Sequence, residues 1–187
     1  MWVQGCTIRC DGCFNPQLWG SAGGTATSPR DLLELVLDAG VEGVTLLGGE
    51  PFEQARELAE FAVLVRDRGM SVMTFTGHER EFLDAPDAPD GAAELLAATD
   101  LLVDGPYRAD SKDLVRPWVG STNQGFHFLT ERYRGLADQL TMLPDRLEVR
   151  VTSTGEVAVN GWATVDRLDA LLAEADARPV VGRGRVR

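Results

Sequence analysis

The chain has 187 residues, a formal net charge of −11 and a sequence pI near 4.6. Such an acidic chain argues against nucleic-acid or anionic-membrane binding, since both require clustered Lys and Arg. Hydrophobic residues make up 44% of the chain, enough for a substantial core. We expect a single domain over residues 1–175 and a flexible Arg- and Gly-rich tail over 176–187. No hydrophobic targeting segment begins the sequence, which predicts a cytoplasmic protein.

Three cysteines near the start of the chain, Cys6, Cys10 and Cys13, are its only ones. A thiolate set this compact favours a soft metal or an iron–sulfur cluster, and three ligands leave one metal position open. A disulfide would leave one cysteine over, and inert thiols usually lie in apolar strands rather than in a polar loop. Structural zinc would need a fourth ligand from His78 or His127, far along the chain, so it is the second interpretation.

The elements that follow alternate between helix and strand. Ser28-Pro29 predicts an N-cap with proline at the first helical position, for a helix that closes at Gly40. We expect strands over 41–47, 71–75 and 101–104 and helices over 53–68 and 92–98. Such alternation is typical of an α/β fold with parallel strands covered by helices. Farther along, alternating residues around Gly155 predict an antiparallel hairpin over 147–159, followed by a helix over 164–175.

Polar and glycine residues follow the predicted strands, at the ends where parallel barrels build their sites. Gly48-Gly49-Glu50-Pro51 leads from a strand into a helix, although Glu50 and Pro51 also suit an ordinary first helical turn. Asp104 ends another strand and has either a site role or an Asx-turn into Gly105.

Two further segments offer groups suited to a ligand. Ser121, Asn123 and Gln124 carry hydroxyl and amide groups, although ordinary turn chemistry also explains their sequence. Phe14 directly follows the last cysteine, where it would either shield a bound group or belong to the core.

The segment from Gly5 to Asn15, followed by Leu18-Trp19, resembles the cluster loop of the radical S-adenosylmethionine superfamily, whose signature is Cys-x₃-Cys-x₂-Cys. The whole segment from Gly5 to Trp19, beyond the cysteine spacing alone, resembles that of the small activating enzymes for glycyl-radical proteins, above all the anaerobic ribonucleotide reductase activases. The resemblance runs to about Gly125, with a weaker match near Gly161. It implies a partial (β/α)₆ TIM-like barrel with a C-terminal antiparallel hairpin.

The resemblance also implies a ligand set. Cys6, Cys10 and Cys13 would hold three irons of a [4Fe–4S] cluster, and S-adenosylmethionine would chelate the fourth. The implied cofactor-binding residues are Gly48, Gly49, Glu50, Pro51, Thr76, Asp104, Ser121, Asn123, Gln124 and Phe14.

Three features depart from the family. Thr76-Gly77-His78 stands where the activase pattern has Thr-Gly-Tyr, so His78 replaces the Tyr. Val119 replaces the usual Arg. Only Met1 to Gln4 precede Gly5, so we expect the first strand to be short or missing, from a start codon placed too far downstream or as an exposed edge.

The implied activity is reductive cleavage of S-adenosylmethionine to methionine and a 5′-deoxyadenosyl radical, which makes a glycyl radical on a partner such as the anaerobic ribonucleotide reductase. A reduced flavodoxin- or ferredoxin-type protein would donate the electron, and no residue need act as an acid or base. Two alternatives stay open. One is a radical enzyme acting on a small molecule or peptide, and the other is a non-catalytic protein that binds a cluster or zinc.

Overall fold

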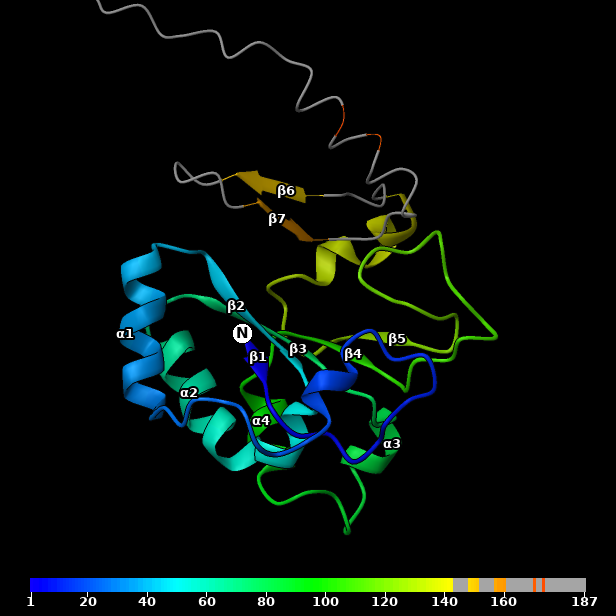
Figure 1. Cartoon of the computed structure of the whole chain (residues 1–187). Helices are drawn as coiled ribbons and strands as arrows, with labels where there is room; N and C mark the ends of the chain where they lie inside the picture. The colour runs from blue at the N-terminus through cyan, green and yellow to red at the C-terminus, as the bar shows by residue number, and fades with distance from the viewer. Residues whose placement is uncertain (143–147, 152–156, 161–169, 171–172, 174–187) are drawn as a thin grey trace, which may run out of the picture. The chain divides into compact units, whose positions relative to one another are not determined.

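The computed structural model describes residues 1–142, 148–151 and 157–160, with Ala170 and Ala173 beyond them. Residues Met1–Leu143 and Pro144–Arg187 form two compact units. In the second unit, β6 (Glu148–Val151) and β7 (Val157–Asn160) pair antiparallel, which confirms the predicted hairpin (Figure 1). Apart from two helical positions, the helix expected over 164–175 lies outside the described residues, as do Gly161 and the tail.

The first unit contains a five-stranded sheet in the order β1-β2-β3-β4-β5. The strands are β1 (Trp2–Val3), β2 (Gly43–Gly48), β3 (Ser71–Phe75), β4 (Leu101–Asp104) and β5 (Gly125–Phe128). The first four run parallel, and β5 pairs antiparallel with β4. The predicted α/β class is confirmed, whereas the six-stranded partial barrel and the single domain over 1–175 stay predictions.

Helices and 3₁₀ turns connect the strands. They are η1 (Pro16–Leu18), α1 (Pro29–Ala39), η2 (Pro51–Gln54), α2 (Ala55–Asp67), α3 (Arg80–Leu83), α4 (Ala92–Ala97) and η3 (Arg134–Met142). As predicted, the Ser28 side chain caps α1 by accepting from the Asp31 amide, and Gly40 ends the helix in the left-handed conformation. Within the described part of the chain, no helix is long and apolar enough to cross a membrane.

The core lies where α2 packs against α1, α4 and β3. Figure 1 shows α1, α2 and α4 gathered together beside the sheet. Phe52, Phe61 and Leu95 are fully buried there. The expected helix over 53–68 begins as the 3₁₀ turn η2 and becomes α-helical at Ala55, which brings Phe52 into the core. This packing fixes the edge at which β2, β3 and β4 end.

The first strand is short, as expected. Only Trp2 and Val3 pair with β2, opposite Leu47 and Gly48. Because β1 is parallel to β2, the chain leaves it at the edge where β2 ends and enters the cysteine loop at once. The alternation of parallel strands and helices therefore brings the cysteines to the loops that follow β2, β3 and β4.

Candidate functional site

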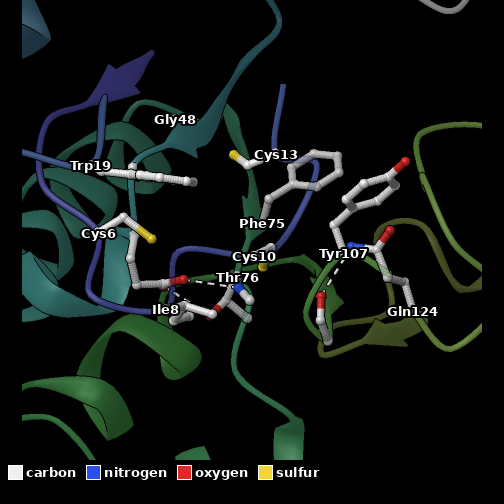
Figure 2. Close-up of a pocket in the computed structure, with 14 residues that line it drawn as sticks. Cys6, Ile8, Cys10, Cys13, Trp19, Gly48, Phe75, Thr76, Tyr107 and Gln124 are labelled. Atoms are coloured by element: carbon white, nitrogen blue, oxygen red, sulfur yellow. Dashed lines mark hydrogen bonds between the residues drawn. The ribbon is translucent and has the colours of Figure 1, made fainter. Parts of the chain in front are cut away.

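An open pocket lies where β2, β3 and β4 end. Its empty volume is about 610 Å³, part of which is open to solvent. All three cysteines line it, and Figure 2 shows them on different sides of the same space. The predicted site residues that also line it are Gly48, Gly49, Glu50, Thr76 and Gln124. Segments far apart in the sequence thus converge on the cysteine loop.

The cysteine loop is closed by backbone hydrogen bonds at its base. Gly5 N donates to Leu18 O at 2.9 Å, and Cys6 N donates to Trp19 O at 3.1 Å. Gly12 has a φ of 73°, and a Cβ there would lie 3.2 Å from the Cβ of Ala109. Glycine at this position therefore relieves strain and lets the loop approach the segment that follows β4.

The three cysteines are free thiols, so the disulfide alternative does not apply. Burial raises the pKa of both Cys6 and Cys10. The negative charges of Glu50 and Glu53 raise the pKa of Cys6 further, against backbone N–H groups that lower it. A bound cation would reverse this tendency, because a coordinating thiol is deprotonated by the metal.

Each sulfur accepts a backbone hydrogen bond. Asn15 N lies 3.4 Å from Cys13 Sγ, the amides of Ile8 and Arg9 face Cys6, and the amide of Tyr107 faces Cys10. Such bonds tune iron–sulfur clusters.

Among the described residues, no group of three or more His, Cys, Asp or Glu side chains is arranged to hold a single metal ion. A cluster does not require that arrangement, since each thiolate binds a different iron. Three thiols around one pocket, each with an N–H donor, form a donor set that fits a cluster.

Gly48 and Gly49 allow the backbone of the cysteine loop to approach β2. Gly49 N donates to Val3 O at 2.8 Å, and Glu50 N donates to Gly5 O at 2.7 Å. A Cβ on Gly49 would lie 2.1 Å from Gly5 O, and one on Gly48 would lie 2.6 Å from Val3 N. Because the chain itself uses these two amides, a ligand would be met here by carbonyl oxygens.

Glu50 is the most enclosed polar residue of the pocket, with a relative exposure of 1%. Its Oε1 accepts from Phe52 N at 2.9 Å and from the Thr76 hydroxyl at 2.8 Å, and its Oε2 accepts from Gly77 N at 2.8 Å. Burial raises the pKa of Glu50 to about 7, although these three donors oppose the shift. The carboxyl group thus joins the loop after β2 to the loop after β3. Pro51, beside it, is buried at the first position of η2.

Asp104 does not line the pocket. Its Oδ2 accepts from Arg80 N at 2.7 Å and its Oδ1 from Gly125 N at 3.1 Å, so it joins the start of α3 to the start of β5. His127 Nε2 lies 3.0 Å from Asp104 Oδ1 without the geometry of a hydrogen bond. A contact between Asp104 and a cofactor stays a prediction.

The segment after Val119 is tied to the loop that follows β4. Gln124 Nε2 donates to Gly105 O at 3.0 Å, and Asn123 Nδ2 donates to Pro106 O at 2.8 Å. The buried Ser121 hydroxyl accepts from Arg108 N at 3.1 Å. Of these three predicted residues only Gln124 lines the pocket.

Phe14 is 64% exposed and does not line the pocket. Its ring packs edge-on against Tyr107, with the ring centroids 6.1 Å apart. The core alternative for Phe14 is therefore wrong, and any contact with a bound group stays a prediction.

Arg116 was missed by the sequence reasoning. Val119, which replaces the usual Arg of the family pattern, is buried with 1% exposure. Arg116 instead supplies a guanidinium, which donates to Gln124 O at 2.9 Å, Thr122 O at 3.1 Å and Ser121 O at 3.3 Å. The signal available in the sequence was only a basic residue near a polar turn.

Six further pocket-lining residues were not assigned to the site from the sequence: Ile8, Trp19, Phe75, Gly77, Gly105 and Tyr107. Figure 2 shows Trp19 beside Cys6, and Phe75 beside Cys13. Three of them, Phe75, Gly77 and Gly105, directly neighbour the predicted residues Thr76 and Asp104, so a wider window around those motifs would have found them. Apolar and aromatic side chains among polar groups give the pocket the mixed lining typical of a cofactor site.

The chain matches the family described as "4Fe-4S single cluster domain" over residues 1–127. It is 32% identical to the "Pyruvate formate-lyase-activating enzyme" of Listeria monocytogenes over 109 residues, which span 55% of this chain and 44% of that protein. It is 28% identical over 139 residues to the "Anaerobic ribonucleoside-triphosphate reductase-activating protein" of Vibrio cholerae, across 70% of this chain and 86% of that one. The Escherichia coli protein of the same name is 26% identical over 138 residues, 69% of this chain and 86% of its own length.

Proposed function

Because the chain belongs to the 4Fe-4S single cluster domain family of radical S-adenosylmethionine activating enzymes, we propose that it is an activase that generates a glycyl radical on a partner protein. The observation that supports this most is the convergence of three thiols and the Gly48-Gly49-Glu50 segment on one pocket. A purely structural cluster would not need an open, mixed-polarity space beside it.

Different residues of the chain would hold the cluster and shape the cofactor pocket. Cys6, Cys10 and Cys13 would hold three irons of a [4Fe–4S] cluster, and S-adenosylmethionine would be the cofactor beside it. When bound, the cluster and cofactor would supply the reductive cleavage of S-adenosylmethionine to methionine and a 5′-deoxyadenosyl radical. Glu50 fixes the loops after β2 and β3 relative to each other, so that carbonyl oxygens of the glycine segment can meet the cofactor's ammonium group.

The remaining predicted residues would hold the other end of the cofactor. Thr76 and Gln124 lie on the pocket wall, and Asp104, Ser121 and Asn123 would act from behind it. The pocket would be the mouth of a partial barrel that keeps water from the reacting groups.

An anaerobic ribonucleotide reductase is the partner we favour. The match covers 86% of the Vibrio cholerae reductase-activating protein but 44% of the Listeria enzyme. The chain thus spans less than half of the pyruvate formate-lyase activators and most of the reductase activators. A flavodoxin- or ferredoxin-type protein would donate the electron, and the free thiols suit a cytoplasmic location.

The test is anaerobic reconstitution with iron and sulfide, followed by dithionite reduction with S-adenosylmethionine and an assay for 5′-deoxyadenosine. Product should form with the wild-type chain and disappear with Cys10→Ala. Leu35→Ala, at an exposed position on α1, is the matched control and should retain it. A loaded cluster that yields no product, or zinc bound in place of iron, would contradict the proposal.

A further inference from the structure

Glu53, in the 3₁₀ turn η2, receives two hydrogen bonds from Thr7 of the cysteine loop. Its Oε1 accepts from Thr7 N at 2.5 Å and from the Thr7 hydroxyl at 2.6 Å. Thr7 directly follows Cys6 and precedes Cys10 by three residues. Both contacts therefore act on the stretch between two of the cysteines.

The neighbour of Glu53 makes a parallel contact. Gln54 Nε2 donates to Gln4 O at 2.7 Å, so two consecutive side chains of η2 hold the chain on either side of Gly5 and Cys6. The same turn begins at Pro51, directly after the Gly48–Glu50 segment. The turn η2 thus joins the cysteine loop to the segment that would meet the cofactor.

Glu53 also places negative charge beside the loop. Its carboxylate is hydrogen-bonded to Thr7, the residue directly after Cys6. A group that adds negative charge near a cluster opposes the uptake of an electron, and solvent exposure weakens the effect without removing it.

We propose that Glu53 is a positioning residue of the cysteine loop, which clamps Thr7 and hence Cys6 to η2 and lowers the reduction potential of a cluster bound there. The clamp is a property of the chain by itself. The effect on the potential rests on the proposed function.

The clamp is tested by hydrogen exchange on the cluster-free full-length chain. Glu53→Ala removes the acceptor and should speed exchange of the Thr7 amide by about tenfold. Glu53→Gln keeps an amide oxygen as acceptor and should exchange close to wild type. An unchanged rate in Glu53→Ala would overturn the clamp, whether or not the chain binds a cluster.

The electrostatic part is tested on the reconstituted chain by a redox titration followed by electron paramagnetic resonance. Glu53→Gln should shift the midpoint potential of the cluster to a more positive value while iron content stays at the wild-type level. Glu60→Gln, an equal loss of charge on the exposed side of α2, is the matched control and should leave the potential unchanged. Equal potentials in wild type and Glu53→Gln would overturn the electrostatic role, whereas failure of the wild type to take up a cluster would count against the proposed function alone.

Discussion

The replacement Gly49→Ala tests the argument that the glycine segment exists for close backbone approach. An added Cβ would lie 2.1 Å from Gly5 O and 2.8 Å from Gly5 C. Both atoms are backbone, so no side chain can rotate out of the way. Relief requires the cysteine loop to move away from β2.

That movement weakens two hydrogen bonds, Gly49 N to Val3 O and Glu50 N to Gly5 O. Overpacking costs about 1–3 kcal/mol, and each hydrogen bond contributes about 1 kcal/mol. We therefore expect Gly49→Ala to lower the free energy of unfolding by about 3 kcal/mol. For a chain of this size, that corresponds to a fall in Tm of about 6–12 °C.

Urea and thermal unfolding of the cluster-free chain measure this effect. Gly20→Ala is the control, because a Cβ there meets nothing within 4 Å and its φ is outside the left-handed region. Iron content after reconstitution should fall in Gly49→Ala and not in Gly20→Ala. If the two variants unfold alike, the close approach at Gly49 does not hold the loop and the reasoning fails.

Three further predictions concern Glu50, on the pocket wall, and Val119 and Arg116, in the segment that precedes Gln124. Burial raises the pKa of Glu50 to about 7 from 4.5, so the folded chain keeps a proton that the unfolded chain releases between these pH values. Stability contributed by Glu50 should therefore fall by about 3 kcal/mol as pH rises through this window, and Glu50→Gln should remove that slope in unfolding measured from pH 4.5 to 7. Val119→Arg would bury a charge at a position with 1% exposure, and should lower the free energy of unfolding by about 3 kcal/mol or more, as urea unfolding would show. Arg116→Met removes the donor to three carbonyl oxygens and should cost about 2 kcal/mol in the same measurement; no loss would mean that solvent satisfies those carbonyls equally well.

The elements with strong local signals were predictable from the sequence. Ser28 and Gly40 mark the ends of α1 through capping chemistry that acts within one helical turn. The run Ser71–Phe75 matches β3 at both ends; Gly69 lies two residues before its β-branched and apolar residues, and a polar turn follows them. Local physics fixes these boundaries, so a single sequence carries them.

Elements that depend on distant partners were not predictable in this way. The strand β5 (Gly125–Phe128) has no long apolar run and exists by pairing antiparallel with β4. The turn η3 (Arg134–Met142) was likewise not expected. Pairing across the sheet overrides weak local preference, which only the folded arrangement shows.

For the site, the motifs identified the cysteines and the glycine segment but not the division of labour among the polar residues. Asp104 and Ser121 lie near pocket-lining residues along the chain. In the structure, their side-chain oxygens already accept hydrogen bonds from backbone N–H groups of the protein. Spacing cannot show whether a polar atom is free, because its partners come from other elements. The assignment of roles therefore needed the hydrogen bonds and not the residue types.

Departures from a family pattern should likewise be judged in space. Val119 stands where the family pattern has Arg, and this replacement by itself suggests a lost contact. Its side chain is fully enclosed, whereas Arg116, three residues earlier, places its guanidinium on the carbonyl oxygens of Ser121, Thr122 and Gln124. A cation at the polar turn is thus retained from another position. If the turn needs a guanidinium to hold Gln124 at the pocket wall, this chain supplies it, and the Val119 replacement does not by itself count against an active site.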